Sequence, residues 1–148
     1  MRREQWDRAA PRLEWLVRYL EAKRMTDALA VRAHQLAKLM ERLGQPQEAL
    51  DYFKLAMQTD GTYLPNIVDY GSFLVRQERW ERALRVHQNL LVQSRKLSDD
   101  VQAQVLYFLA LACHKLDQRE KAQLYITRLM NQAPEHPEGL ALKALIGG

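Results

Sequence analysis

Histidine and cysteine are the residues of this chain whose side chains most readily bind metals or act as nucleophiles. The sequence holds four histidines and one cysteine, at His34, His87, His114, His136 and Cys113. None of the histidines has the paired spacing of a zinc site, and one thiol supplies neither a thiolate metal centre nor a disulfide framework. His87 stands at a core place of its helix, so we expect it to be packed and hydrogen-bonded. Cys113 follows Leu109 and Ala110, which predicts a buried, unreactive thiol.

Other catalytic patterns are missing from the sequence as well. It has no glycine-rich phosphate loop, no Gly-x-Ser-x-Gly motif and no pair of carboxylates spaced for acid–base work. Asp99 and Asp100 follow Ser98, a pattern typical of a helix start. There a serine caps the helix, and the helix dipole stabilises acidic side chains in the first turn. We therefore expect no enzymatic activity, no cofactor and no bound metal.

Composition narrows the class of protein further. The chain has 148 residues, 47% of them hydrophobic and 27% charged, with a formal net charge of +4. This length fits one domain with a sizeable core, and six glycines and five prolines are too few for a disordered chain. No apolar run approaches the roughly 20 residues that span a bilayer, and the start has no apolar stretch of a secretory signal. We expect a soluble, ordered, cytoplasmic domain.

The elements that position these residues repeat along the chain. An anchor alanine is followed by apolar or ring residues four and seven positions later, which is one face of a helix. A small residue precedes each anchor by 12 positions, in the pairs Ala37 and Ala49, Gly71 and Ala83, and Ala110 and Ala122. The repeating unit is therefore a helical hairpin with small residues where its two helices cross. Ala9, in Trp6-Asp7-Arg8-Ala9, is interpreted as a further anchor.

This pattern predicts an all-α solenoid of antiparallel hairpins. The expected helices are 6–23, 26–43, 46–59, 64–77, 80–95, 99–116, 119–132 and 137–146. Pro11 is tolerated if the first helix begins near Asp7, because first-turn amides need no intrahelical acceptor. The expected single domain, 1–148, is divided into a half repeat or cap helix (1–25), three repeats (26–62, 63–97 and 98–135) and a C-terminal half repeat or cap (136–148).

These residues resemble the tetratricopeptide repeat family. The match lies in the 34-residue interval between anchors, the pairs Leu36-Ala37, Tyr70-Gly71 and Leu109-Ala110, the Phe53-Ala56 pair and Pro134. The sequence departs from the family where an early Trp is preferred, since Ala33, Ile67 and Leu106 stand there. The resemblance implies a right-handed superhelix whose concave face binds peptides or protein segments, as an adaptor or scaffold does.

A narrower resemblance links residues 46–130 to the repeats of bacterial lipopolysaccharide assembly protein B. It is clearest over residues 83–90 and hints at a bacterial origin. That family also has an N-terminal membrane anchor and a rubredoxin-like module with cysteine pairs, and this sequence shows neither.

The concave face implied by the resemblance is lined by the first helix of each hairpin. The partner-binding residues expected there are His34, Lys38, Arg42, Val68, Ser72, Val75, Arg76, Tyr107, Leu111, His114 and Lys115, with Glu41 beside them. Basic residues surround an apolar strip, so we expect an acidic segment with hydrophobic anchors as partner. Asp69 and Phe108 stand where the carboxylate clamp of chaperone-binding repeats has Asn and Arg, so a chaperone tail is not expected.

Three alternatives stay open. The terminal half repeats of neighbouring copies can complete one hairpin head to tail, which builds rings or filaments. The sequence pI near 9.3 permits RNA binding, although the charges alternate in sign along 78–82, as on a solvated helix face. A partner can also use the convex side, or the terminal helices with Trp6 and Trp15.

Overall fold

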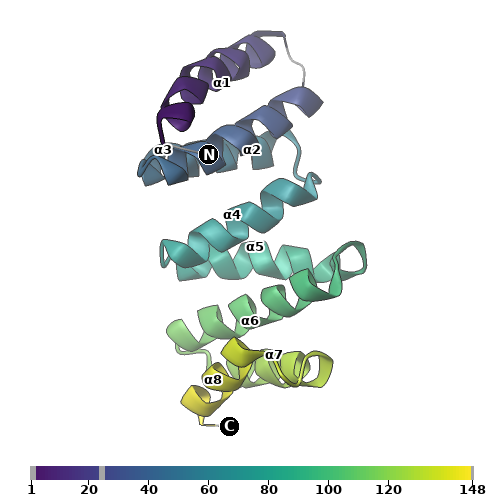
Figure 1. Ribbon diagram of the computed structural model, residues 1–148. Coiled ribbons are helices and arrows are strands. Elements are labelled where there is room, and N and C mark those ends of the chain that lie inside the picture. Colours follow the sequence, from purple (N-terminus) through teal and green to yellow (C-terminus); the bar gives the residue numbers. More distant parts are fainter. Residues whose placement is uncertain (1–2, 24–25, 148) are drawn as a thin grey trace. The chain divides into compact units, whose positions relative to one another are not determined.

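The computed structural model describes the backbone of residues 3–23 and 26–147, and the side chains of residues 7–21 and 28–147. Eight α-helices and one short 3₁₀ helix make up the regular structure of this part, which holds no strand (Figure 1). They are α1 (Arg3–Lys23), α2 (Thr26–Arg42), α3 (Pro46–Thr59), α4 (Leu64–Arg76), α5 (Trp80–Val92), η1 (Ser94–Lys96), α6 (Asp99–Lys115), α7 (Arg119–Gln132) and α8 (Pro137–Ile146). The expected all-α class is confirmed.

The chain divides into two compact units, Met1–Tyr70 and Gly71–Gly148. The first holds α1, α2, α3 and the start of α4, and the second holds the rest of α4 and α5 to α8. In the first unit α2 packs on α1 and α3; in the second α6 packs on α5 and α7. The expected repeat boundaries within one domain stay a prediction.

Small residues lie buried where the helices of each hairpin cross. Ala37 and Ala49 in the first unit, and Ala83, Ala110 and Ala122 in the second, have no exposed surface. Gly71 is another such place, where an added Cβ would lie 2.8 Å from Cε1 and 2.9 Å from Nε2 of His87. The hairpin with small residues at its crossing is thus confirmed, and glycine is required there because the imidazole fills the space.

The three turns inside the hairpins share one backbone geometry. Gly44, Glu78 and Asp117 all have a left-handed φ, between 56° and 76°. In each turn the next amide donates to a carbonyl five residues back, as Gln45 does to Met40, and the left-handed amide donates three residues back. This is the Schellman ending of a helix, in which glycine fits without strain and Glu or Asp costs about 1 kcal/mol.

Two helix ends differ from the sequence expectation. α1 begins at Arg3, so Pro11 lies inside the helix and not in its first turn. Pro11 is exposed, so water can hydrate the Asp7 carbonyl that the missing amide leaves without a donor. α5 ends at Val92 and is followed by η1, so the expectation of a helix through Arg95 is wrong.

The packing register of α1 also differs from the expectation. Ala10, Val17 and Leu20 form its buried stripe, whereas the expected anchor Ala9 is half-buried. The likeness of Trp6-Asp7-Arg8-Ala9 to residues 80–83 therefore gives a register one residue off. The side chain of Trp6 lies outside the described residues.

Candidate functional site

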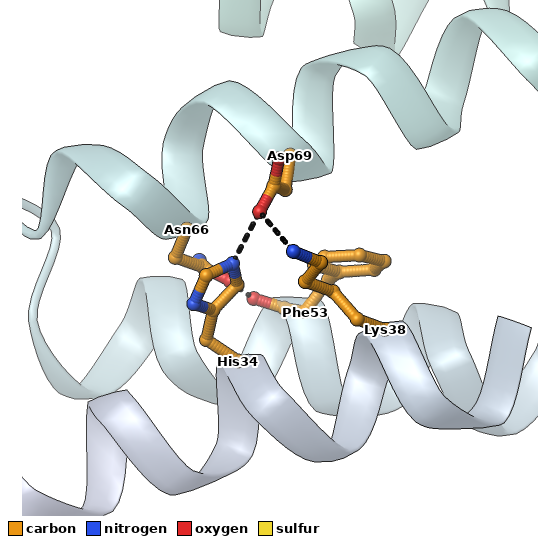
Figure 2. A network of polar contacts seen from close by, with 5 residues as sticks. All are labelled: His34, Lys38, Phe53, Asn66 and Asp69. Carbon is orange, nitrogen blue, oxygen red and sulfur yellow. Dashed lines mark hydrogen bonds and ion pairs between the residues drawn. The ribbon is translucent and has the colours of Figure 1, made fainter. Parts of the chain in front are cut away.

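Three polar side chains from α2 and α4 meet in the first unit (Figure 2). His34 Nε2 lies 2.6 Å from Asp69 Oδ2, and Lys38 Nζ lies 3.5 Å from the same oxygen. His34 is only 7% exposed, and the rings of Phe53 and Tyr63 pack around it. The imidazole is thereby held in place and pairs with the carboxylate.

The Asp69 carboxylate is stabilised in its charged form by these neighbours. Burial alone would raise the pKa of Asp69, but the hydrogen bond with His34 and the positive charge of Lys38 together hold that pKa below its usual range. Nearby, the buried Asn66 donates through Nδ2 to the Phe53 carbonyl oxygen at 3.3 Å (Figure 2). The network thus ties α4 to both helices of the α2–α3 hairpin.

This network changes the local chemistry of the predicted face in the first unit. His34 is buried and bonded, whereas Lys38 and Arg42 are exposed and Val68 is half-buried. Asp69, which the predicted set omits, places a carboxylate beside Lys38 and offsets its charge. The sequence shows Asp69 only as a departure from the carboxylate clamp, because its partner His34 lies 35 residues away.

The remaining predicted residues belong to the second unit. Arg76 and Lys115 are exposed; Ser72, Val75, Tyr107, Leu111 and His114 are half-buried. Lys115 Nζ lies 5.9 Å from the ring centroid of Trp80, in cation–π geometry. Both predicted cations are thus accessible, and one of them stands over an indole.

A cavity of about 790 Å³ in the second unit is lined by none of the predicted residues. It lies among the start of α6, the end of α7 and the start of α8. Its lining residues are Asp99, Asp100, Val101, Gln102, Ala103, Gln104, Gln132, Ala133, His136 and Glu138. Three carboxylates make this acidic cavity negative, the sign opposite to the predicted face.

Amide side chains fix the walls of the acidic cavity. Gln102 Nε2 donates to the carbonyls of Ser94 at 2.7 Å and Leu97 at 3.0 Å. Gln132 Nε2 donates in turn to Gln102 Oε1 at 3.3 Å, which joins α7 to α6. The carboxylates therefore project from a wall that hydrogen bonds hold, and they can accept hydrogen bonds from a cationic ligand.

An aromatic side chain adjoins the acidic cavity through His136. The ring of Tyr107 lies 5.8 Å from that of His136, whose Nδ1 accepts the amide proton of Gly139 and caps α8. Burial, and then the charge of Glu138, raise the pKa of Tyr107. Tyr107 is thus a predicted residue in contact with a residue that lines the cavity. In the sequence, Ser98-Asp99-Asp100 at the cavity indicates only a helix start.

Groups that could support covalent or metal chemistry are not assembled in the described part of the chain. No three His, Cys, Asp or Glu side chains in it are grouped to hold a metal ion. Cys113 is buried as expected, and burial raises its pKa against a smaller opposing effect of Lys121. The thiol is therefore a poor nucleophile.

His87 is packed as expected, but its expected hydrogen bond is not formed. It is 1% exposed, and neither ring nitrogen has a partner of hydrogen-bond geometry among the described residues. Burial lowers its pKa to about 4, against a smaller opposing effect of the Gly71 backbone. The imidazole is therefore a neutral core residue near pH 7, wedged against Gly71.

Within the described helices, none has the length and apolar character needed to span a bilayer. On α1, Trp15 is 65% exposed and stacks on Tyr19 with ring centroids 5.4 Å apart.

Comparisons with known proteins agree with the helical-hairpin fold. Residues 71–101 match the family model described as tetratricopeptide repeat. No curated protein matches this sequence. The matched segment contains the close contact between Gly71 and His87 and the turn at Glu78.

Solved structures share the fold at low sequence identity. MamA from Desulfovibrio magneticus RS-1, from residue 41 to its end, is 18% identical with a TM-score of 0.67, over 93% of this chain and 78% of that chain. YrrB, titled a TPR protein with an unusual peptide-binding site, is also 18% identical at 0.67, over 92% and 75%. The N-terminal domain of stress-induced protein-1 from C. elegans is 13% identical at 0.70, over 84% and 98%.

These identities establish the fold and leave the narrower resemblance to lipopolysaccharide assembly protein B a prediction. At identities of 13–18% and TM-scores of 0.67–0.70, the likeness lies in the arrangement of the helices. The chain therefore folds as a tetratricopeptide-repeat protein, and residues 71–101 are its segment that matches the tetratricopeptide repeat family in sequence.

Proposed function

We propose that the chain is a protein–protein interaction module, an adaptor or assembly scaffold that binds an extended segment of a partner. The observation that carries the proposal is the acidic cavity, because it is a preformed recess lined by side chains from three helices. A preformed site orders the ligand without reorganising the scaffold, which lowers the entropic cost of binding. The peptide-binding site named for YrrB supports the proposal by analogy of fold.

The chemistry of the acidic cavity favours a segment with a basic side chain. Asp99, Asp100 and Glu138 attract a lysine or arginine, and the amides of Gln104 and Gln132 can bond a peptide backbone. Tyr107 offers an aromatic surface beside His136 for an apolar neighbour of the basic residue. No catalytic step is part of the proposal, since the single thiol is buried.

Peptide display tests this proposal directly. We expect the wild-type chain to enrich segments with a basic residue next to an apolar one. The double variant Asp100→Asn, Glu138→Gln should bind the enriched peptides at least about tenfold more weakly, since each loses a charge-assisted hydrogen bond. The control variant Glu48→Gln, Glu120→Gln removes two exposed carboxylates away from the cavity and should bind normally. Enrichment of no basic peptide family would contradict the acidic cavity as the binding site.

The expected acidic partner concerns a different surface and is tested separately. Reversal of three cations on the predicted face, Arg42→Glu, Arg76→Glu and Lys115→Glu, should abolish capture of acidic peptides if that face binds them. Capture that survives the triple reversal would remove the face from the proposal. The RNA-binding alternative also stays a prediction.

Self-association is a second candidate that one observation favours. The described part of α8 exposes Leu140 (48%) and Leu145 (67%), two apolar side chains on different faces of the helix that another copy can contact. Light scattering over a concentration series should then show growth of mass with concentration. A mass that stays that of one chain would reject head-to-tail assembly.

A further inference from the structure

The start of α5 holds a second recess in the second unit, with a charge opposite to that of the acidic cavity. It measures about 310 Å³ and is lined by Arg79, Trp80, Glu81, Arg82 and Arg85. Three guanidinium groups against one carboxylate leave this basic recess with a formal charge of +2. None of its residues belongs to the predicted partner-binding set.

The arginines of the basic recess lack anionic partners. In the part of the chain whose side chains are described, Arg79, Arg82 and Arg85 form no ion pair. Arg82 Nη1 is moreover buried without any hydrogen-bond acceptor. Guanidinium groups without an anionic partner attract an anion that enters their recess. The recess is therefore set to receive an anion.

An indole forms one wall of the basic recess. Trp80 is half-buried, and Lys115 from α6 lies over its ring. A cation outside the lining of the recess thus stands over this indole. A tryptophan surrounded by arginines is the composition that recurs where protein segments bind most tightly.

We propose that the basic recess binds the carboxylate side chains of an acidic segment of a partner protein. The guanidinium groups of Arg82 and Arg85 accept no hydrogen bonds and present paired N–H donors, which match the two oxygens of a carboxylate. Trp80 packs against an apolar residue beside the acidic one. The ligand class rests on the proposed interaction function, whereas the site is separate from the acidic cavity.

A protein segment fits the basic recess better than a nucleic acid does. Single-stranded nucleic acid binds on successive exposed rings along a continuous positive track. The large hydrophobic residues exposed in the second unit are Val92, Leu124, Leu140 and Leu145, none of which is aromatic. Glu78 and Glu81 also interrupt the positive charge next to the arginines.

The experiment uses the full chain labelled with 5-fluorotryptophan, so that fluorine NMR reports Trp80 separately from Trp6 and Trp15. The probe is a short glutamate-rich peptide with a central leucine. We expect the Trp80 resonance to shift on titration and the other two to stay. The double variant Arg82→Gln, Arg85→Gln should weaken binding about tenfold or more. Arg85→Gln alone, at an exposed position, should weaken binding of the probe about threefold. This single variant replaces the double variant in the test if the double variant unfolds.

A matched control separates the site from net charge. The variant Arg95→Gln, Lys96→Gln removes two exposed cations in η1 and should bind the probe like wild type. Equal loss in both double variants, or binding that leaves the Trp80 resonance unmoved, would overturn the basic recess while the interaction function stands. Tighter binding of an RNA oligomer, or of inorganic phosphate alone, at the same resonance would overturn the acidic segment as its ligand. Failure of both the acidic probe and the displayed peptides would count against the interaction function itself.

Discussion

Two buried histidines, one in each unit, differ in the hydrogen-bond partners that their neighbours offer the ring nitrogens. His34 lies against the Asp69 carboxylate at 2.6 Å, so its ring has a partner for either protonation state of the imidazole. His87 lies against Gly71 and Phe108, and among the described residues neither of its nitrogens has a hydrogen-bond partner; burial lowers its pKa to about 4. The first histidine joins two helices by a polar contact, and the second only fills space.

The largest expected effect is acid destabilisation through His87. In the unfolded chain its pKa is near 6.5, so the unfolded state takes up a proton first as the pH falls. The free energy of unfolding should therefore fall by about 3 kcal/mol between about pH 6.5 and pH 4. Denaturant unfolding at a series of pH values measures this. In the variant His87→Leu, the free energy of unfolding should no longer fall with pH over that range. An unchanged pH dependence in this variant would mean that another group causes it.

A methyl group at Gly71 should have the next largest effect. Gly71→Ala places a Cβ 2.8 Å from the buried His87 ring, and such overpacking destabilises by about 2 kcal/mol. The corresponding crossing in the first unit already has Ala37. Combining Gly71→Ala with His87→Ala should recover part of the loss, since the clash is removed. Additive losses in that double-mutant cycle would contradict the close contact.

Removing the carboxylate partner of His34 should cost less. Asp69→Leu removes a charge-assisted hydrogen bond and leaves the imidazole unpaired, at a cost of about 1–2 kcal/mol. Asp69→Asn keeps one hydrogen-bonding oxygen and should cost about half as much. Chemical denaturation of both variants at pH 7 tests this order. An Asn variant as unstable as the Leu variant would show that the negative charge matters more than the hydrogen bond.

The smallest effect is expected for Lys38, the other partner of Asp69. Its ammonium group lies 3.5 Å from the carboxylate and its side chain is 49% exposed, so water screens the pair. Lys38→Met should change the free energy of unfolding by less than about 0.5 kcal/mol. A loss as large as that of Asp69→Leu would mean that Lys38, and not His34, holds the carboxylate.

The sequence predicts the helices well because their signals are local. Anchor alanines, crossing residues and turn lengths recur at fixed spacing, and a repeat needs only its neighbours to fold. The end of one helix and the buried face of another were harder to predict. α5 ends three residues before Arg95, and Ala10, in place of Ala9, is buried in α1. These details depend on tertiary packing that no local pattern records.

The candidate sites were predicted less well, for a physical reason. The pairing of His34 with Asp69, and the meeting of Asp100 with Glu138 around one cavity, join residues more than thirty positions apart. A charge on a helix surface looks the same in sequence whether it faces solvent or a recess. The predicted partner-binding residues stay a prediction. Beside them, the acidic cavity is proposed to bind basic side chains and the basic recess acidic ones.

The shared geometry at Gly44, Glu78 and Asp117 makes the chain modular at the level of the gene. Each of these residues lies five positions before an anchor alanine, so the stretch from one to the next begins and ends in the same backbone conformation. Duplicating or deleting residues 44–77 or 78–116 therefore joins two turns of the same backbone conformation and creates no new kind of turn. Arrays of this kind can lengthen or shorten by unequal recombination, while each surviving hairpin keeps the fold that it had.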